Sequence, residues 1–160
     1  YAEQYYQHVK AFPRYISATH SNCQLSQARK VLLENLNDEE GMNGLDSHPA
    51  LWLQFTKGLG LSEATVTSSA IFPETKQFIN EFLSLSRTSY AEGLGALYAY
   101  ERQIPQTAAS KIMGLKQFYD IEDEVSKDWQ PETAQEMHDL IMAHKKRDPE
   151  SIEQALEMIK

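Results

Sequence analysis

The chain has 160 residues, of which 41% are hydrophobic and 24% are charged, and these proportions predict one globular domain with its own core. The net charge of −8 argues against binding to a nucleic-acid backbone, and no apolar run approaches the roughly 20 residues of a membrane span. Cys23 is the single cysteine, so no internal disulfide is expected, and the cytoplasm is the expected compartment.

Apolar residues recur at helical spacing from the start of the chain, and no run alternates as a strand would. A first helix is predicted over about residues 1–19, with a kink at Pro13. Asn22 is expected to cap a second helix. A third helix is predicted to begin near His48 and to end at the turn formed by residues 58–60.

The second half of the chain continues the helical pattern. Ser62 begins a short helix, and Pro73 suits the first turn of the next one, whose inward residues are expected to be Phe78, Phe82 and Leu85. Small residues alternate with aromatics over residues 89–101, which predicts a helix at the centre of the bundle. Further helices are predicted over 106–119, over 131–145 and from Pro149. The expected fold is a single all-α domain of about eight helices.

Two carboxylates continue apolar helical stripes. Glu39 lies three residues after Leu36, and Glu101 follows Leu94 and Leu97 at helical spacing. A buried carboxylate must be protonated, paired or bound to a metal, because an isolated buried charge is costly. Two carboxylates from separate helices with a histidine nearby are typical of a two-metal site.

Each of these residues also has a purely structural interpretation. Glu39 could be part of a solvated acidic helix end, Glu101 could pair with Arg102 or Lys111, and His48 could be a surface residue beside a proline. The remaining histidines are expected in the core, at a helix end or on the surface: His8, His20, His138 and His144. Spacing alone therefore leaves both interpretations open.

A resemblance to a known family is carried by four stretches: "YAEQYYQHVKAFPRYISATHSNC", "ARKVLLENLNDEEG", "HPALWLQFTKGLG" and "LGALYAYERQIPQTAASKIMGLKQFY". Together they resemble the TenA/PqqC superfamily and, within it, the CADD-like branch (Chlamydia protein associating with death domains). The resemblance runs from Tyr1 to about Tyr119. It implies a heme-oxygenase-like bundle of about seven or eight helices and a non-heme diiron oxidase that activates O2.

The resemblance also implies a set of metal ligands. Glu39 and His48 correspond to the first half-site, and Glu101 to the glutamate of a Tyr-x-Tyr-Glu motif. Two iron ions, or one iron and one manganese, are expected. In the family the residual ligands come from a later helix that carries His-x3-Asp-x2-His.

The sequence departs from this pattern in the first half-site. The family usually separates the glutamate from the histidine by about seven residues, which places both on one helix face. Here the separation is nine, with Gly41 and Gly44 in between. Either the helix breaks near these glycines or His48 is not the ligand.

The second departure is that no His-x3-Asp-x2-His occurs in the sequence. That helix is expected near Asp128 and Trp129, which do not continue one amphipathic face. We hypothesise that the sequence omits a ligand-bearing helix at this junction, and an N-terminal segment before Tyr1.

For the CADD-like branch the implied activity is the synthesis of para-aminobenzoate for folate, outside the chorismate route, from a small molecule or from a tyrosine of the protein itself with a lysine as nitrogen source. Tyr100 and Tyr1 are the candidate tyrosines here, and Lys111 is the candidate lysine. An apolar environment would lower the pKa of a lysine, whereas a lysine at the surface would have no special chemistry.

Three other functions remain as alternatives. A metal-free oxidase like PqqC would need more basic residues than the 15 present, and a TenA-like thiaminase would need a nucleophilic cysteine on a central helix, where Cys23 is not expected. A non-catalytic interaction protein is the third. By analogy with the superfamily a homodimer is expected, without nucleic-acid or membrane partners.

Overall fold

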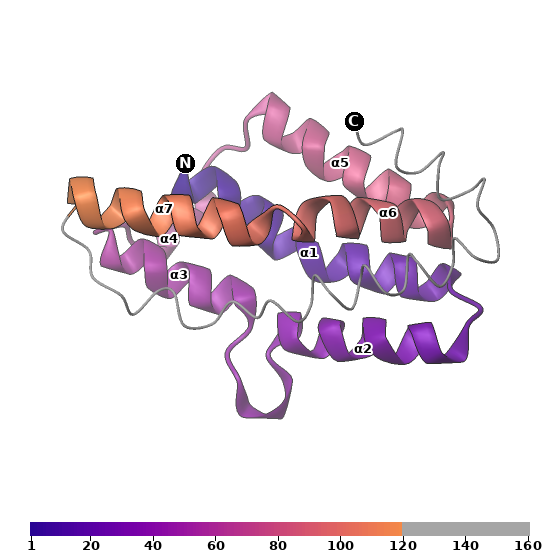
Figure 1. Cartoon of the computed structure of the whole chain (residues 1–160). Coiled ribbons are helices and arrows are strands. Elements are labelled where there is room, and N and C mark those ends of the chain that lie inside the picture. Colours follow the sequence, from indigo (N-terminus) through magenta and orange to yellow (C-terminus); the bar gives the residue numbers. More distant parts are fainter. Residues whose placement is uncertain (120–160) are drawn as a thin grey trace. The chain divides into compact units, whose positions relative to one another are not determined.

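The computed structural model describes residues 1–119, and every regular element in this part is helical. The elements are α1 (Ala2–Asn22), α2 (Ser26–Glu40), the 3-10 turn η1 (Met42–Gly44), α3 (His48–Gly58), α4 (Glu63–Ser68), α5 (Pro73–Thr88), α6 (Tyr90–Glu101) and α7 (Ile104–Tyr119) (Figure 1). The all-α prediction is thereby confirmed. The predicted helices beyond residue 130 and the proposed junction at 128/129 lie outside the described residues.

The chain divides into two compact units, residues 1–94 and the part from Gly95 onward. Within the first unit α1 is the central element, and α2, α3, α4 and α5 all pack against it (Figure 1). Side chains with 0% exposure from three of these helices, α1, α2 and α4, and from the first half of α6 contribute to its core: Tyr15, Ile16, Leu32, Val66 and Leu94. None of the described helices is long and apolar enough to cross a membrane.

Local sequence signals explain where several helices begin. The Ser47 hydroxyl accepts a hydrogen bond from the Ala50 amide at 3.3 Å, and the Ser62 hydroxyl accepts one from the Thr65 amide at 3.1 Å. These bonds satisfy amides that have no partner within the first helical turn. Pro73 occupies the first turn of α5, where a missing amide hydrogen has no cost. The predicted helix starts at Ser62 and Pro73 are confirmed.

The predicted cap at Asn22 is wrong. Asn22 is the last residue of α1, and α2 begins only at Ser26. The Asn22 side-chain amide instead donates hydrogen bonds to the carbonyl oxygens of Ser86, at 3.0 Å, and Arg87, at 3.1 Å. The last carbonyls of a helix lack intrahelical donors, so Asn22 ties the end of α1 to the end of α5.

The inward face of α5 is narrower than predicted. Phe82 is 6% exposed, as expected, but Phe78 is 44% exposed and Leu85 is only half-buried. Phe78 still covers the His8 ring, at a centroid distance of 4.9 Å. One side of the Phe78 ring therefore closes the core while the other remains in solvent.

Helix α6 is buried around most of its circumference, as predicted for residues 89–101. Its Gly93 lies against α1 and α5. A β-carbon built on Gly93 would contact the Thr19 hydroxyl, would lie 3.0 Å from Thr19 Cγ2, and would lie 3.1 Å from Ser86 Cα. Only glycine leaves enough room for this approach.

Candidate metal centre

The polypeptide between α2 and α3 turns sharply at two glycines. Gly41 ends α2 with φ 72° and ψ 45°, in the left-handed region that glycine adopts without strain. The 3-10 turn η1 ends at Gly44, with φ 83°, and the chain becomes extended at Leu45. The predicted helix break near Gly41 and Gly44 is confirmed.

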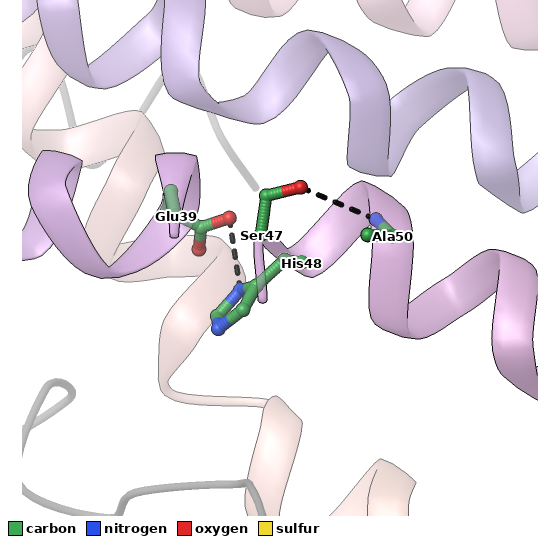
Figure 2. A network of polar contacts seen from close by, with 4 residues as sticks. All are labelled: Glu39, Ser47, His48 and Ala50. Atoms are coloured by element: carbon green, nitrogen blue, oxygen red, sulfur yellow. Dashed lines mark hydrogen bonds and ion pairs between the residues drawn. The ribbon is translucent and has the colours of Figure 1, made fainter. Parts of the chain in front are cut away.

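This break brings the two ends of the segment together at Glu39 and His48. Nδ1 of His48 lies 2.9 Å from Oε2 of Glu39, and the two side chains are 43% and 8% exposed, respectively (Figure 2). Because an ionised carboxylate only accepts hydrogen bonds, the imidazole Nδ1–H is the donor. The nine-residue separation, which an unbroken helix would place on different faces, thus becomes a direct contact.

The backbone of His48 is held in place from both sides. His48 is the first residue of α3, and Ser47 caps that helix through the Ala50 amide (Figure 2). The side-chain amide of Gln54 donates to Oδ2 of Asp46 at 2.8 Å, which ties the end of the turn to the next part of α3. The imidazole is therefore presented to Glu39 by a capped helix end.

A carboxylate oxygen and an imidazole nitrogen are donor types that non-heme iron accepts. The 2.9 Å between Nδ1 of His48 and Oε2 of Glu39 is an ordinary hydrogen-bond length, and it places both donor atoms within reach of one ion. Among residues 1–119 no group of three or more histidine, cysteine, aspartate or glutamate side chains gathers as a complete metal site. The pair fits one side of an iron site.

Glu101 ends α6 with 8% exposure, on the same stripe as Leu94 at 0% and Leu97 at 1%. The predicted burial of this carboxylate is confirmed. Glu101 belongs to the second unit of the chain. Its role as a metal ligand stays a prediction.

The candidate catalytic residues of the second unit lie on α6 and α7. Tyr100 is half-buried, and Lys111 is exposed. Exposure of Lys111 agrees with the surface position that the sequence left as one alternative. Arg102, next to Glu101, places its guanidinium 6.0 Å from the centre of the Tyr98 ring. The catalytic roles of Tyr100 and Lys111 stay predictions.

Tyr1, which directly precedes α1, lies beside Tyr5. Their rings stack at a centroid distance of 5.4 Å, and Tyr1 is 71% exposed. Tyr5 in turn contacts the ring of Trp52 at 4.7 Å, and the Trp52 indole N–H donates to the carbonyl of Ala2 at 2.9 Å. This contact fastens α3 to the start of α1.

A cluster of aromatic rings surrounds His8, and residue spacing along the sequence indicates only some of its members. The side chain is 3% exposed, and burial lowers its pKa from 6.5 to about 4. Five rings lie at centroid distances between 4.9 and 6.0 Å from the imidazole: Tyr5, Phe12, Tyr15, Phe78 and Phe82. Steps of three and four along α1 indicate the first three neighbours, but the two from α5 depend on tertiary packing.

Tyr15, the most enclosed of these residues, is fully buried. Its ring stacks on Phe82 at 4.3 Å, and burial raises the pKa of its phenol. In the described part of the chain the Tyr15 hydroxyl has no hydrogen-bond partner. No sequence signal distinguished this tyrosine from the others.

Cys23 occupies a structural position at the end of α1. It is 3% exposed, and its thiol lies 3.6 Å from the carbonyl oxygen of Leu25. A buried thiol directed at a backbone carbonyl is a poor nucleophile. This arrangement argues against a thiaminase mechanism based on cysteine.

Curated relatives are 4-aminobenzoate synthases. The chain is 43% identical to the synthase of Chlamydia pneumoniae over 122 residues, which is 76% of this chain and 54% of the relative. It is 43% identical to the synthase of Chlamydia trachomatis serovar D over 120 residues, which is 74% of this chain and 51% of that relative. For the synthase of Nitrosomonas europaea the identity is 40% over 134 residues, and the match covers 77% of this chain and 53% of that relative. The chain thus spans about half the length of the curated relatives it matches.

A match to one protein family covers most of the chain. Residues 1–129 match the family of iron-containing redox enzymes, a range that includes Glu39, His48 and Glu101. The paired carboxylate and imidazole between α2 and α3 are donors suited to the metal of that family. The chain therefore belongs to the iron-containing redox enzymes.

Proposed function

We propose that this chain is part of an O2-dependent, non-heme iron oxidase that makes 4-aminobenzoate. The observation that carries this proposal is the 2.9 Å contact between Glu39 and His48, which the helix break at Gly41 makes possible. We take the product from the names of the relatives, which are 4-aminobenzoate synthases, and the metal from the family, which consists of iron-containing redox enzymes. We further propose two metal ions, both iron or one iron and one manganese.

Glu39 and His48 would hold a metal ion, and Glu101, in the second unit, is proposed as a ligand from its family motif alone. Bound iron would supply the one-electron redox chemistry through which O2 oxidises an organic substrate. With no metal bound, Oε2 of Glu39 accepts the hydrogen bond from Nδ1–H of His48, and a metal ion held by these two atoms would take the place of that proton. The Glu39 side chain is 8% exposed and therefore poorly hydrated. A buried anion favours a cation beside it, which is the electrostatic requirement of a metal ligand.

We propose Tyr100 or Tyr1 as the source of the aromatic ring and Lys111 as the source of nitrogen. 4-Aminobenzoate contains a para-substituted ring and one nitrogen, and the side chains of tyrosine and lysine contain these two parts. Tyr100 adjoins Glu101, and Lys111 lies on the following helix. The exposure of Tyr1 and Lys111 leaves both accessible to a partner or small substrate.

The test compares two neighbouring glutamates. Glu39 contacts His48, whereas Glu40 is exposed beside it and serves as the matched control. The whole chain is loaded with Fe(II) without oxygen, its bound iron is counted, and 4-aminobenzoate is measured by mass spectrometry after O2 is added. The expected result for Glu39→Gln is a loss of at least about tenfold in iron affinity and in product, as for other lost ligands and their partners. Glu40→Gln should match the unmodified chain.

Equal iron binding by Glu39→Gln and Glu40→Gln would exclude Glu39 from the metal site. Product formation without chorismate, from protein labelled with 13C-tyrosine and 15N-lysine, would show whether the ring and the nitrogen come from the protein. Unlabelled product would point to an external substrate. No iron and no product from the unmodified chain would overturn the proposed function.

A further inference from the structure

Gly41 does more than end α2, because the returning chain lies directly on it. A β-carbon built at this position would lie 2.7 Å from the carbonyl carbon of Asp46, 2.7 Å from the carbonyl oxygen of Leu45, and closer still to the amide nitrogen of Ser47. All three atoms belong to the backbone, so no side-chain rotation can relieve the overlap. The segment Leu45–Ser47 can pack here only against a residue without a side chain.

Gly44 provides the internal comparison. It also has a positive φ, 83° against 72° for Gly41, so both positions favour glycine for conformational reasons. A β-carbon on Gly44, however, would meet no atom within 4 Å. The two glycines therefore share a positive φ and differ in what lies against them.

The contact at Gly41 lies between the two members of the candidate half-site. Gly41 follows Glu39 by two residues, and Ser47 directly precedes His48. Packing of Ser47 on Gly41 thus fixes the start of α3 relative to the end of α2. We propose that Gly41 is a positioning residue: its bare α-carbon is the surface on which Leu45–Ser47 packs, and this packing sets the distance between Glu39 and His48.

If Gly41 positions the two residues, its substitution should affect both iron binding and the hydrogen bond between Glu39 and His48. The consequence for iron rests on the proposed function, since it requires Glu39 and His48 to be ligands. The consequence for the hydrogen bond does not, since the contact between Nδ1 and Oε2 forms without metal. The experiment separates these two consequences.

Asparagine is the most informative substitution at both glycines. Among residues with a side chain it adopts the left-handed conformation most readily, so the backbone strain is small and similar at the two positions. Only Gly41→Asn introduces a β-carbon into the returning backbone. Gly44→Asn is therefore the matched control for conformation, and Glu39→Ala is the control in which the acceptor is absent.

The first readout is the tautomer of the His48 imidazole in the metal-free chain, measured by 15N NMR at about pH 8.5, above the ordinary histidine pKa of about 6.5. The Nδ1–H form should predominate in the unmodified chain and in Gly44→Asn. It should be lost in Gly41→Asn and Glu39→Ala. Amide shifts of α1 and α5 show whether each variant keeps its fold.

The second readout is the affinity for Fe(II) in the absence of oxygen. Gly41→Asn should weaken binding at least about tenfold, as loss of an oriented ligand does, and Gly44→Asn should change it less than about threefold. Retention of the Nδ1–H form in Gly41→Asn, its absence in the unmodified chain, or general unfolding of Gly41→Asn would each overturn the positioning role. A different outcome is that Gly41→Asn and Glu39→Ala both lose the Nδ1–H form while both bind Fe(II) as tightly as the unmodified chain. That outcome would preserve the positioning role of Gly41 and reject the proposed iron site.

Discussion

At the scale of single residues, His8 shows how strongly the core constrains an ionisable group. An imidazole with 3% exposure among aromatic rings loses most of its hydration when it carries a proton. This is why burial lowers the pKa of His8 to about 4. His8 is therefore neutral in the folded protein at pH 5 to 7, whereas in the unfolded chain it takes up a proton below about pH 6.5.

The low pKa of His8 predicts that acid destabilises the folded protein. Since the folded pKa is below the unfolded value, protonation favours the unfolded chain, and stability falls as the pH drops from 6.5 toward 4. Between pH 7 and pH 5 the loss due to His8 is about 2 kcal/mol. Urea unfolding at both pH values should show that His8→Phe removes about this much of the total pH dependence. The same pH dependence in both proteins would show that His8 is accessible to protons in the folded state.

Individual residues also show what the sequence could and could not predict. The nine-residue separation of Glu39 and His48 required a helix break only if His48 is a ligand, because an unbroken helix would place the two residues on different faces. The separation could not show that the chain folds back after η1 and brings His48 to Glu39, since that depends on the contact of Ser47 with Gly41. Asn22 failed as a predicted cap for a related reason. Its amide found carbonyl acceptors on α5, which is remote in the sequence.

At the scale of helices, the approach of α6 to α1 and α5 depends on Gly93. Thr19, which a β-carbon on Gly93 would meet, has little freedom to move, because its hydroxyl donates to the carbonyl of Tyr15 at 2.9 Å and its χ1 is restricted by β-branching. The sequence predicted close packing from the small residues of this helix. It did not identify which helices would approach, because that depends on the fold.

Gly93→Ala is accordingly predicted to destabilise the protein by about 1–3 kcal/mol through overpacking. Adding Thr19→Ala should recover part of the loss, so that the double variant is less destabilised than the sum of the two single ones. Gly58→Ala, at the end of α3, is the control, because a β-carbon there meets nothing within 4 Å. Chemical denaturation of the four variants gives the comparison. Additive effects of Gly93→Ala and Thr19→Ala would mean that α6 moves away from α1 instead of pressing against Thr19.

At the scale of the whole molecule, composition and helical period predicted the all-α class, because apolar residues recur at helical spacing along the chain. The remaining ligands of a diiron site could not be assigned in this way. The motif expected for them does not occur in the sequence, and residues 1–119 gather no third ligand around Glu39 and His48. The homodimer expected by analogy also stays a prediction. The described residues do contain the Glu39–His48 pair, in a strongly acidic chain with a net charge of −8.

That acidic charge makes the choice of metal the decisive test of the pair. Any divalent cation is attracted to such a chain, but an imidazole with a carboxylate selects iron over magnesium, which prefers oxygen ligands. Free Fe(II) at about 100 times its dissociation constant should stabilise the folded chain by about 2.7 kcal/mol. For a domain of this size that corresponds to a rise in Tm of roughly 5–10 °C. Thermal unfolding without oxygen should show the rise for the unmodified chain and Glu40→Gln, a much smaller one for Glu39→Gln, and its reversal by a chelator. An equal rise with magnesium would mean that the chain responds only to charge and that Glu39 and His48 do not select the metal.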